Sequence, residues 1–352
     1  MPEASRRIAP SARAALPALA WLCAVACSGA PDVVAHDTSS ALPPDDPDDP
    51  TRAPVSLSLS GDLDVHDPSV IESRAGFFLF HTGPGLSTKL SNDLLTWRAG
   101  PRVFAESPAW IADLVPGATN LWSPDIAFFR GEYHLYYAVS TFGSDRSCIG
   151  HATRARLDDD AAWTDRGQIL CSNIAPGTDD WNAIDPDLVL DELEMPWLVF
   201  GSFSSGIQLV PLDVAGARST GEVRRVAARP EAGNVIQQGT IVRRESEYYL
   251  FVSFDFCCRG VDSTHYIVVG RSSALQGPYL DRDGRPLLEG GGTVVLAGDA
   301  RFSGPGSNVL LQRGTRTYNV YHAYDVNDGG RATLRIAELT WDAEGWPISA
   351  GP

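Results

Sequence analysis

The sequence is poor in basic residues and in cysteines, and it has no long apolar run. Its 28 lysines and arginines stand against 44 aspartates and glutamates, which gives a formal net charge of −16. A chain this acidic, with no basic stripe, is not expected to bind nucleic acid. The apolar run of residues 14–26 is too short to span a bilayer. No stretch keeps a helical period over three turns, so a helical fold is not expected either.

The six cysteines show no spacing typical of a zinc site. Cys148 and Cys171 lie 23 residues apart, a sensible loop for a disulfide in an oxidising compartment. Cys257 and Cys258 are adjacent. A vicinal disulfide between them and two buried free thiols remain equal alternatives.

The N-terminal residues have the pattern of an export signal. Three arginines within residues 6–13 precede the apolar run, which ends just before Cys27. This pattern resembles a bacterial lipoprotein signal with Cys27 as the lipidated residue. Ala24 replaces the leucine usual in such signals, so ordinary signal cleavage remains the alternative. We therefore assign residues 1–27 to a lipoprotein-type signal. We expect an exported protein that meets a bacterial membrane only through its lipid anchor, or else a secreted or periplasmic one.

The next segment, residues 28–56, is acidic, rich in proline and nearly free of large apolar residues. Such a composition cannot bury enough surface to fold, so we expect a disordered tether. The remaining residues, 57–352, are expected to form one domain.

One pattern recurs five times in that domain. A polar residue precedes a short apolar strand, and after a turn a second apolar strand ends in small polar residues. The expected lead residues are at positions 67, 125, 185, 237 and 307, separated by 58, 60, 52 and 70 residues. A repeat of this kind predicts an all-β fold, a five-bladed β-propeller. The large aromatic residues of the repeats are expected in the core between blades; they are Phe77, Tyr133, Trp197, Tyr249 and Tyr318.

Three of the lead residues are acidic: Asp67, Asp125 and Asp185. The inner strands of a propeller begin at the same end of its channel, so these carboxylates are expected to line one pocket. Burying acids together costs free energy unless they bind a ligand or share protons. An amide at position 67 or 185 is therefore expected to leave stability unchanged or raise it. Trp122 and Phe142 are expected to offer apolar faces to a substrate in this pocket.

Several long motifs in the domain resemble glycoside hydrolase family 43, and more narrowly its arabinanases, which attack α-1,5-linked arabinofuranose chains. The resemblance runs from about residue 62 to 347. The motifs that carry it are residues 66–68, 80–85, 121–126, 139–144, 182–186, 251–260 and 288–293.

The resemblance implies an inverting glycosidase that acts on arabinan or arabino-oligosaccharides. Inverting enzymes use a general base to activate water and a general acid to protonate the leaving oxygen. Carried over by motif, Asp67 is the general base, and Asp185 raises the pKa of the general acid and orients that acid. Asp125 is a pocket residue whose role stays open between sugar contact and structural anchor. We expect a monomer.

The chain departs from the family pattern at two functional positions. The family's general-acid glutamate falls on Gln237, and an amide has no acidic proton to give. The family's channel histidine, which is bound to a metal ion, falls on Ser307, so we expect the channel Ca²⁺ to be lost or weakened and assign no metal ligand. Glu231 and Glu289 are not placed convincingly as substitutes. Two hypotheses follow: an impaired arabinan hydrolase, or a catalytically silent protein that binds arabino-oligosaccharides.

Overall fold

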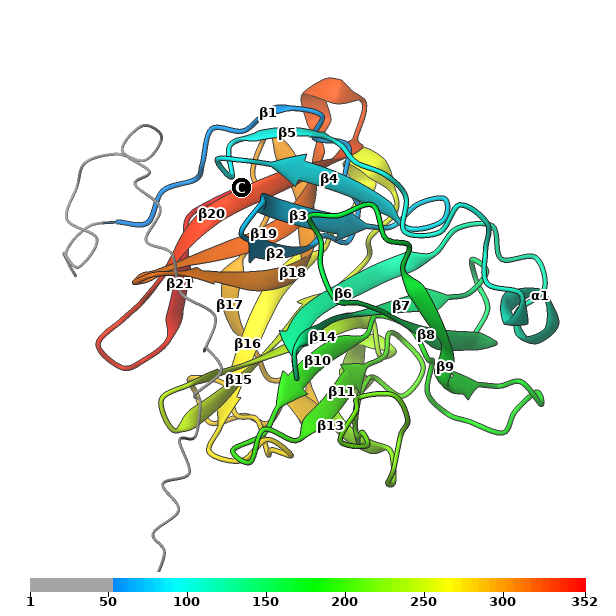
Figure 1. Ribbon diagram of the computed structural model, residues 1–352. Helices are drawn as coiled ribbons and strands as arrows, with labels where there is room; N and C mark the ends of the chain where they lie inside the picture. Colours follow the sequence, from blue (N-terminus) through cyan, green and yellow to red (C-terminus); the bar gives the residue numbers. More distant parts are fainter. Residues whose placement is uncertain (1–52) are drawn as a thin grey trace, which may run out of the picture. The chain divides into compact units, whose positions relative to one another are not determined.

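The computed structural model describes residues 53–352. The predicted signal segment, Cys27 and most of the predicted tether lie outside these residues. Within the described part, the chain folds into five sheets arranged around a common centre, and all their strand pairs are antiparallel except one at the outer edge of the first sheet (Figure 1). This arrangement confirms the predicted five-bladed β-propeller.

The five blades follow one another along the chain, and the innermost strand comes first in each. Blade 1 contains β2 (Ser69–Ser73), β3 (Gly76–His81), β4 (Ser87–Ser91) and β5 (Thr96–Ala99), and β1 (Ser60–Gly61) is added at its outer edge. Blade 2 contains β6 (Trp122–Phe129), β7 (Glu132–Val139), β8 (Ser147–Arg154) and β9 (Thr164–Ser172). Blade 3 contains β10 (Asp187–Leu190), β11 (Pro196–Phe200), β12 (Ile207–Pro211) and β13 (Arg224–Ala227).

Blade 4 contains β14 (Ile236–Arg244), β15 (Glu247–Phe254), β16 (Tyr266–Ser272) and β17 (Thr293–Leu296). Blade 5 contains β18 (Phe302–Arg313), β19 (Arg316–Asp325), β20 (Arg331–Trp341) and β21 (Pro347–Ser349). The helices are short: α1 (Trp110–Leu114), η1 (Pro230–Ala232), η2 (Gly260–Asp262), η3 (Leu287–Glu289) and η4 (Val326–Asp328). None of those in residues 53–352 is long and apolar enough to cross a membrane.

The ring closes between blade 5 and blade 1. Neighbouring inner strands contact one another around the centre, and β18 returns to β2. The segment before blade 1 adds a second connection, because β1 pairs in parallel with β5 while Leu57 N donates to Ile336 O in β20. These contacts begin at Val55, whose N–H donates to Glu338, two residues before the expected domain boundary.

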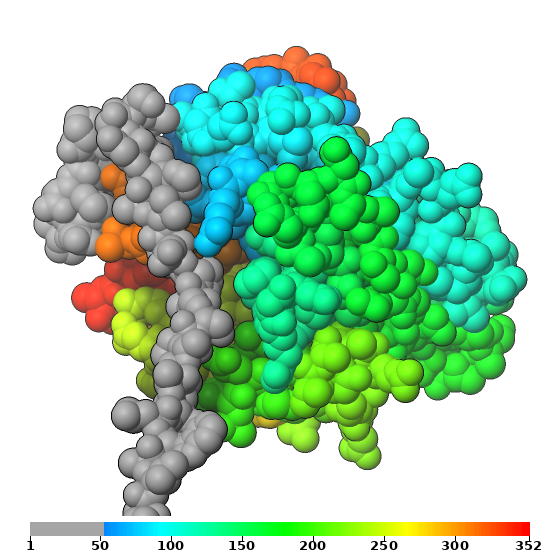
Figure 2. Space-filling view, viewed as in Figure 1, coloured from blue at the N-terminus to red at the C-terminus, as the bar shows by residue number. Residues whose placement is uncertain are grey.

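The core consists of five apolar clusters that lie mainly between adjacent blades. In the cluster between blades 5 and 1, Phe77 packs with Tyr318 and Val320. Tyr249 is buried in the cluster between blades 4 and 5, whereas Tyr133 and Trp197 pack at the edges of two others. The prediction that these aromatic residues form the core between blades is confirmed. Each fully buried side chain of this size contributes roughly 1.5–3 kcal/mol to folding. In the space-filling view the segments of blades 1 to 3 follow one another across the visible face, from cyan to green (Figure 2).

Each blade has a residue in left-handed backbone conformation just before its inner strand or in the first half of that strand. These residues are Asp67, Ser123, Asp185, Gln238 and Ser307, with φ between 39° and 54°. In blades 2, 4 and 5 the β-ladder shifts register at this point, and such a bulge turns a side chain away from the regular alternation of the strand.

One of the expected lead positions is therefore wrong. In blade 2 Ser123 lines the cleft, and Asp125 lies two residues further along β6. In blade 4 the left-handed residue is Gln238, but Gln237, just before the bulge, is the residue that lines the cleft, as expected. A bulge changes which side chain faces the channel, and a count of residues along an apolar strand does not reveal it.

Candidate active site

A cleft of about 1010 Å³ opens at the end of the propeller where the inner strands begin. All five blades contribute to its lining. Among the lining residues are Asp67, Trp122, Phe142, Asp185 and Gln237, so the structure brings five of the six expected pocket residues together. Asp125 is the exception.

The lead residues are held in place by side chains of the preceding blade. The N–H of Ser123 donates to Thr82 Oγ1 (2.9 Å), and the N–H of Asp67 donates to His322 Nδ1 (3.1 Å). Two further lead residues repeat this junction; the pairs are Gln238 N to Ser202 Oγ (3.2 Å) and Ser307 N to Ser253 Oγ (3.0 Å). Because each acceptor stands at the end of a second strand, these bonds fix the start of one inner strand relative to the blade before it. The small polar residues at the ends of the second strands were the sequence signal of this arrangement.

Asp67 is a buried carboxylate with strong partners. Thr82 Oγ1 donates to its Oδ2 (2.7 Å), and His66 Nδ1 contacts the same oxygen at 2.7 Å. Burial alone would raise the pKa of Asp67, but the charge of His66 and these contacts outweigh it and hold the pKa well below its usual range. Asp67 is therefore ionised, and its Oδ1 remains available to a water molecule, as a general base requires.

The carboxylate of Asp67 favours the protonated form of its partner, His66. Burial opposes its charge, but the carboxylate of Asp67 outweighs burial and raises the pKa of His66. The other ring nitrogen, Nε2, lies 2.9 Å from Tyr324 Oη. An amide at position 67 would remove the counter-charge of the protonated imidazole. For Asp67 we therefore expect such a change to cost stability, in contrast to the expectation from buried acids alone.

Asp185 differs from Asp67 although both are buried. Burial and the nearby charge of Asp67 raise the pKa of Asp185 to about 6, and hydrogen bonds from Ser123 and Ser202 oppose this only in part. The Ser202 hydroxyl also accepts the N–H of Gln238, which links Asp185 to the strand of position 237. Two neighbouring carboxyls with pKa values pushed apart are an arrangement in which one is ionised while the other can hold a proton close to neutral pH.

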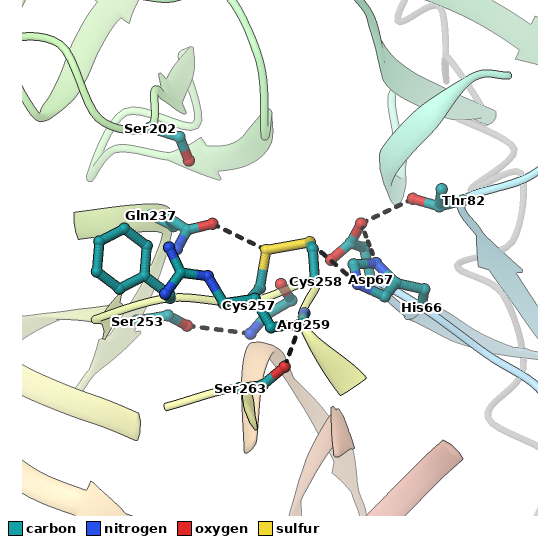
Figure 3. Close-up of a disulfide and its surroundings, with 12 residues drawn as sticks. His66, Asp67, Thr82, Ser202, Gln237, Ser253, Cys257, Cys258, Arg259 and Ser263 are labelled. Atoms are coloured by element: carbon teal, nitrogen blue, oxygen red, sulfur yellow. Dashed lines mark hydrogen bonds and ion pairs between the residues drawn. A yellow bond between two sulfur atoms is a disulfide. The ribbon is translucent and has the colours of Figure 1, made fainter. Parts of the chain in front are cut away.

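Gln237 lies where the family resemblance places the general acid. Its Nε2 donates to the backbone oxygen of Asp255 (2.7 Å), and since a carbonyl oxygen only accepts, this bond fixes the orientation of the amide. The amide oxygen faces the Sγ of Cys257 at 3.2 Å (Figure 3). This position therefore offers the cleft a hydrogen-bond acceptor and no titratable proton.

Neither carboxyl considered from the sequence as a substitute for the acid lines the cleft. The acidic residues that line it are Asp67, Asp185 and Asp145, and Asp145 is an exposed residue of the loop after β7. Glu231 and Glu289 do not line the cleft; Glu231 pairs with Arg285 on the surface at 3.2 Å. The carboxylate of Asp255 is engaged by Arg229. The two substitutes considered from the sequence are thus not in position.

Asp125 connects blades instead of lining the cleft. Its oxygens accept from Ser69 Oγ (3.1 Å) in blade 1 and from the N–H of Leu188 (2.8 Å) in blade 3. Asp187, which the sequence did not single out, continues this pattern by accepting from the N–H of Ile241 (3.2 Å) in blade 4. Burial raises the pKa of both carboxyls, that of Asp125 to about 6. Of the two roles left open for Asp125, these contacts support the structural anchor.

Aromatic side chains form the apolar part of the cleft. Trp122 is half-buried, whereas the ring of Phe142 is 86% exposed on the rim. Phe203 and Phe256, which the sequence did not single out, also line the cleft, and their ring centroids are 6.4 Å apart. Aromatic faces beside a few polar groups are typical of a sugar-binding cleft.

The described residues do not fit the family's channel Ca²⁺. Ca²⁺ prefers six to eight oxygen ligands. The family's metal-bound histidine position is Ser307 here, and the residue before it, Gly306, lies against the imidazole of His265 and pairs with His322 in the β-ladder. A second group, His66 with Asp67 and His322, has its nitrogens close enough for a metal ion, but the Nδ1 of His322 already accepts the N–H of Asp67. We therefore derive no step through a metal ion.

The disulfide predicted between Cys148 and Cys171 is present, and of the two alternatives for Cys257 and Cys258 the structure shows the vicinal disulfide. In Figure 3 this bridge lies between Gln237 and the His66–Asp67 pair.

Comparison with known proteins identifies relatives over nearly the whole described domain. The model of the family "Glycosyl hydrolases family 43" matches residues 61–347. The chain is 40% identical over 288 residues to the extracellular endo-α-(1→5)-L-arabinanase 1 of Bacillus subtilis, covering 80% of this chain and 87% of that protein. It is 38% identical to the extracellular exo-α-(1→5)-L-arabinofuranosidase ArbA of Cellvibrio japonicus, covering 81% of this chain and 86% of that protein.

Solved structures agree with these relatives. The family 43 endo-arabinanase from Bacillus licheniformis superposes with a TM-score of 0.79 at 42% identity, covering 83% of this chain and 99% of that chain. The α-L-arabinanase of Cellvibrio cellulosa, solved in complex with arabinohexaose, superposes with a TM-score of 0.78 at 37% identity, covering 82% and 96%.

Proposed function

Since the chain belongs to glycosyl hydrolases family 43, we propose that its cleft recognises arabinan chains and hydrolyses them slowly, by inverting attack on α-1,5-arabinofuranosyl linkages. The relatives support the substrate, because two of them, at 40% and 38% identity, are an arabinanase and an arabinofuranosidase. Their extracellular location supports export of this chain as well. The one observation that carries the proposal is the contrast between a well-formed base at Asp67 and an amide at Gln237.

In the proposed reaction, Oδ1 of Asp67 accepts a proton from a water molecule that attacks the anomeric carbon. His66 and Thr82 hold the carboxylate ionised through its other oxygen. The linking oxygen must leave with a proton, and Gln237 has none to give, so in the slow reaction this proton comes from a solvent water molecule. Loss of a positioned general acid typically slows a reaction by about 10²–10⁴-fold. Binding is thus retained while turnover is impaired.

A second candidate function is capture of arabino-oligosaccharides without cleavage. The observation that favours it is that Gln237 has no titratable proton and that neither Glu231 nor Glu289 lines the described cleft. Capture would suit a protein held on the cell surface.

For the N-terminal part, we propose that residues 1–27 direct lipidation of Cys27 and that residues 28–56 act as a tether. We propose a monomer for the propeller, residues 57–352.

Binding and cleavage can be measured together. Linear α-1,5-arabino-oligosaccharides are titrated into the purified protein, and released reducing ends are followed at high protein concentration. We expect saturable binding, weakened by Trp122→Ala and unchanged by Leu193→Ala, since Leu193 is an exposed apolar residue outside the cleft. Slow release of reducing ends supports the hydrolase, and binding without any release supports capture. Absence of binding would refute both.

A further inference from the structure

The vicinal disulfide occupies the space between the two catalytic positions. Sγ of Cys257 lies 3.2 Å from the amide oxygen of Gln237, and Sγ of Cys258 lies 3.6 Å from Nε2 of His66 (Figure 3). Because both sulfurs are in the disulfide, neither carries a hydrogen to donate to Gln237 or His66. The bridge therefore extends from the acid position to the partner of the base.

The loop that carries the bridge is anchored by its backbone. The N–H of Cys258 donates to Tyr324 Oη (2.8 Å), and the N–H of Arg259 donates to Ser263 Oγ (3.0 Å). The guanidinium of Arg259 lies 3.8 Å from the centre of the Phe256 ring. Cys258 itself is in left-handed conformation, with φ of 67°. These contacts place the two sulfurs without any contribution from a ligand.

The bridge is also accessible. Cys258 is exposed, Cys257 is half-buried, and both line the cleft beside Phe256. A pair of bonded sulfurs is a compact, polarizable and apolar surface. Such a surface suits the C–H face of a sugar ring, in the same way as the aromatic part of the cleft. Two thiols in its place would add a hydrogen-bond donor directed at Gln237.

We propose that the oxidised Cys257–Cys258 pair is a sugar-contacting wall of the cleft. It packs against the C–H face of the furanose ring whose linking oxygen lies at Gln237. This inference rests on the proposed function, and it makes substrate affinity depend on the oxidation state of the pair. Reduction frees the two sulfurs to separate, so the flat apolar contact is lost.

Removing the other disulfide lets reduction act on the vicinal bridge alone. In the variant Cys148→Ser/Cys171→Ser, the vicinal bridge is the one disulfide left among residues 53–352. A linear arabino-oligosaccharide is titrated into this variant before reduction, after reduction by a phosphine, and after reoxidation, and alkylation followed by mass spectrometry counts the free thiols. We expect reduction to weaken binding about 10-fold and reoxidation to restore it, while the melting temperature changes little because the loop backbone keeps its anchors.

A second variant, Cys257→Ser/Cys258→Ser, tests the same point without a reductant and should match the reduced protein in affinity. Equal affinity, within twofold, of the oxidised and reduced proteins would overturn the inference. Loss of affinity that only follows a large fall in melting temperature would also overturn it, since the bridge would then be a structural staple. If the untreated wild type binds no arabino-oligosaccharide, it is the proposed function that fails, and this inference falls with it.

Discussion

Replacing Gln237 with glutamate should restore efficient hydrolysis of arabinan. The new carboxyl would take the place of an amide whose Nε2 now donates to the backbone oxygen of Asp255 at 2.7 Å. An ionised carboxylate would put an oxygen against that carbonyl oxygen, so the site favours the protonated form and raises the pKa of the new acid. A general acid with a raised pKa is what the leaving oxygen requires.

The expected gain is about 10²–10⁴-fold in turnover. At about 1.4 kcal/mol per factor of ten, this corresponds to roughly 2.7–5.4 kcal/mol of transition-state stabilisation. Activity needs Asp67 ionised and position 237 protonated. Because the pKa of Asp67 lies well below its usual range, the acidic limb of the pH profile should fall below about pH 4, the ordinary range of an aspartate. The alkaline limb should report the new carboxyl.

The assay is the release of reducing ends from linear arabinan over a range of pH, with three comparisons. Gln238→Glu is the matched control, because Gln238 is the adjacent residue and does not line the cleft; it should not gain activity. An aryl arabinoside with a good leaving group needs little protonation, so the gain from Gln237→Glu should be much smaller on it than on arabinan. The double variant with Ser307→His tests whether the channel histidine must return too.

Two results would refute this reasoning. One is a wild type that already degrades arabinan at ordinary glycosidase rates and does not respond to Gln237→Glu, since another group would then be the acid. The other is an equal gain from Gln238→Glu, since the assignment of position 237 would then be wrong.

Three other changes give further tests. Asp185→Asn should raise the free energy of unfolding by up to about 3 kcal/mol above pH 6 and leave it unchanged below pH 4. The reason is that a carboxyl whose pKa is raised from 3.8 to about 6 costs stability once it must ionise while buried. Denaturant unfolding at pH 4 and pH 7 measures this difference, and equal effects at the two pH values would contradict it. Asp67→Asn should abolish residual hydrolysis and cost about 3 kcal/mol of stability. This decrease in unfolding free energy should have its full size between pH 3.8 and pH 6.5, the ordinary pKa values of Asp67 and His66, where both partners are charged in the unfolded chain too. Below and above this window it should be smaller. Urea unfolding at pH 5.5 would show the decrease, and an unchanged midpoint would argue against the ion pair. Cys27→Ser should move the protein from the membrane fraction to the soluble fraction without altering its melting temperature, whereas a wild type that is already soluble would exclude the anchor.

The fold could be predicted from the sequence because the period of the repeat is a long-range signal. The place of Asp67 and Asp185 in the cleft could be predicted because each comes just before its strand in a motif of the form Asp-Pro. Asp125 follows a serine and a proline, and the bulge that makes Ser123 the lead residue cannot be seen in the sequence.

Other features depended on contacts between distant residues. The ion pair of Asp67 with His66 changes the effect on stability that we expect from an amide at position 67. The expectation from the sequence counts the burial of the acid and not its partner. The acceptor role of His322 toward the N–H of Asp67 joins the last blade to the first, 255 residues apart. The bond between Cys257 and Cys258 stayed open because adjacency permits a disulfide but does not require one.

The central claim is that this cleft binds an arabinan chain with a working base and no general acid. A crystal structure of the wild-type protein, grown for days at neutral pH with a linear arabino-oligosaccharide, tests it most directly. We predict an intact oligosaccharide across the cleft, with the linking oxygen beside Gln237 and a water molecule on Asp67. Cleaved products in the crystal, or a carboxyl group other than Asp67 within hydrogen-bonding distance of the linking oxygen, would contradict it.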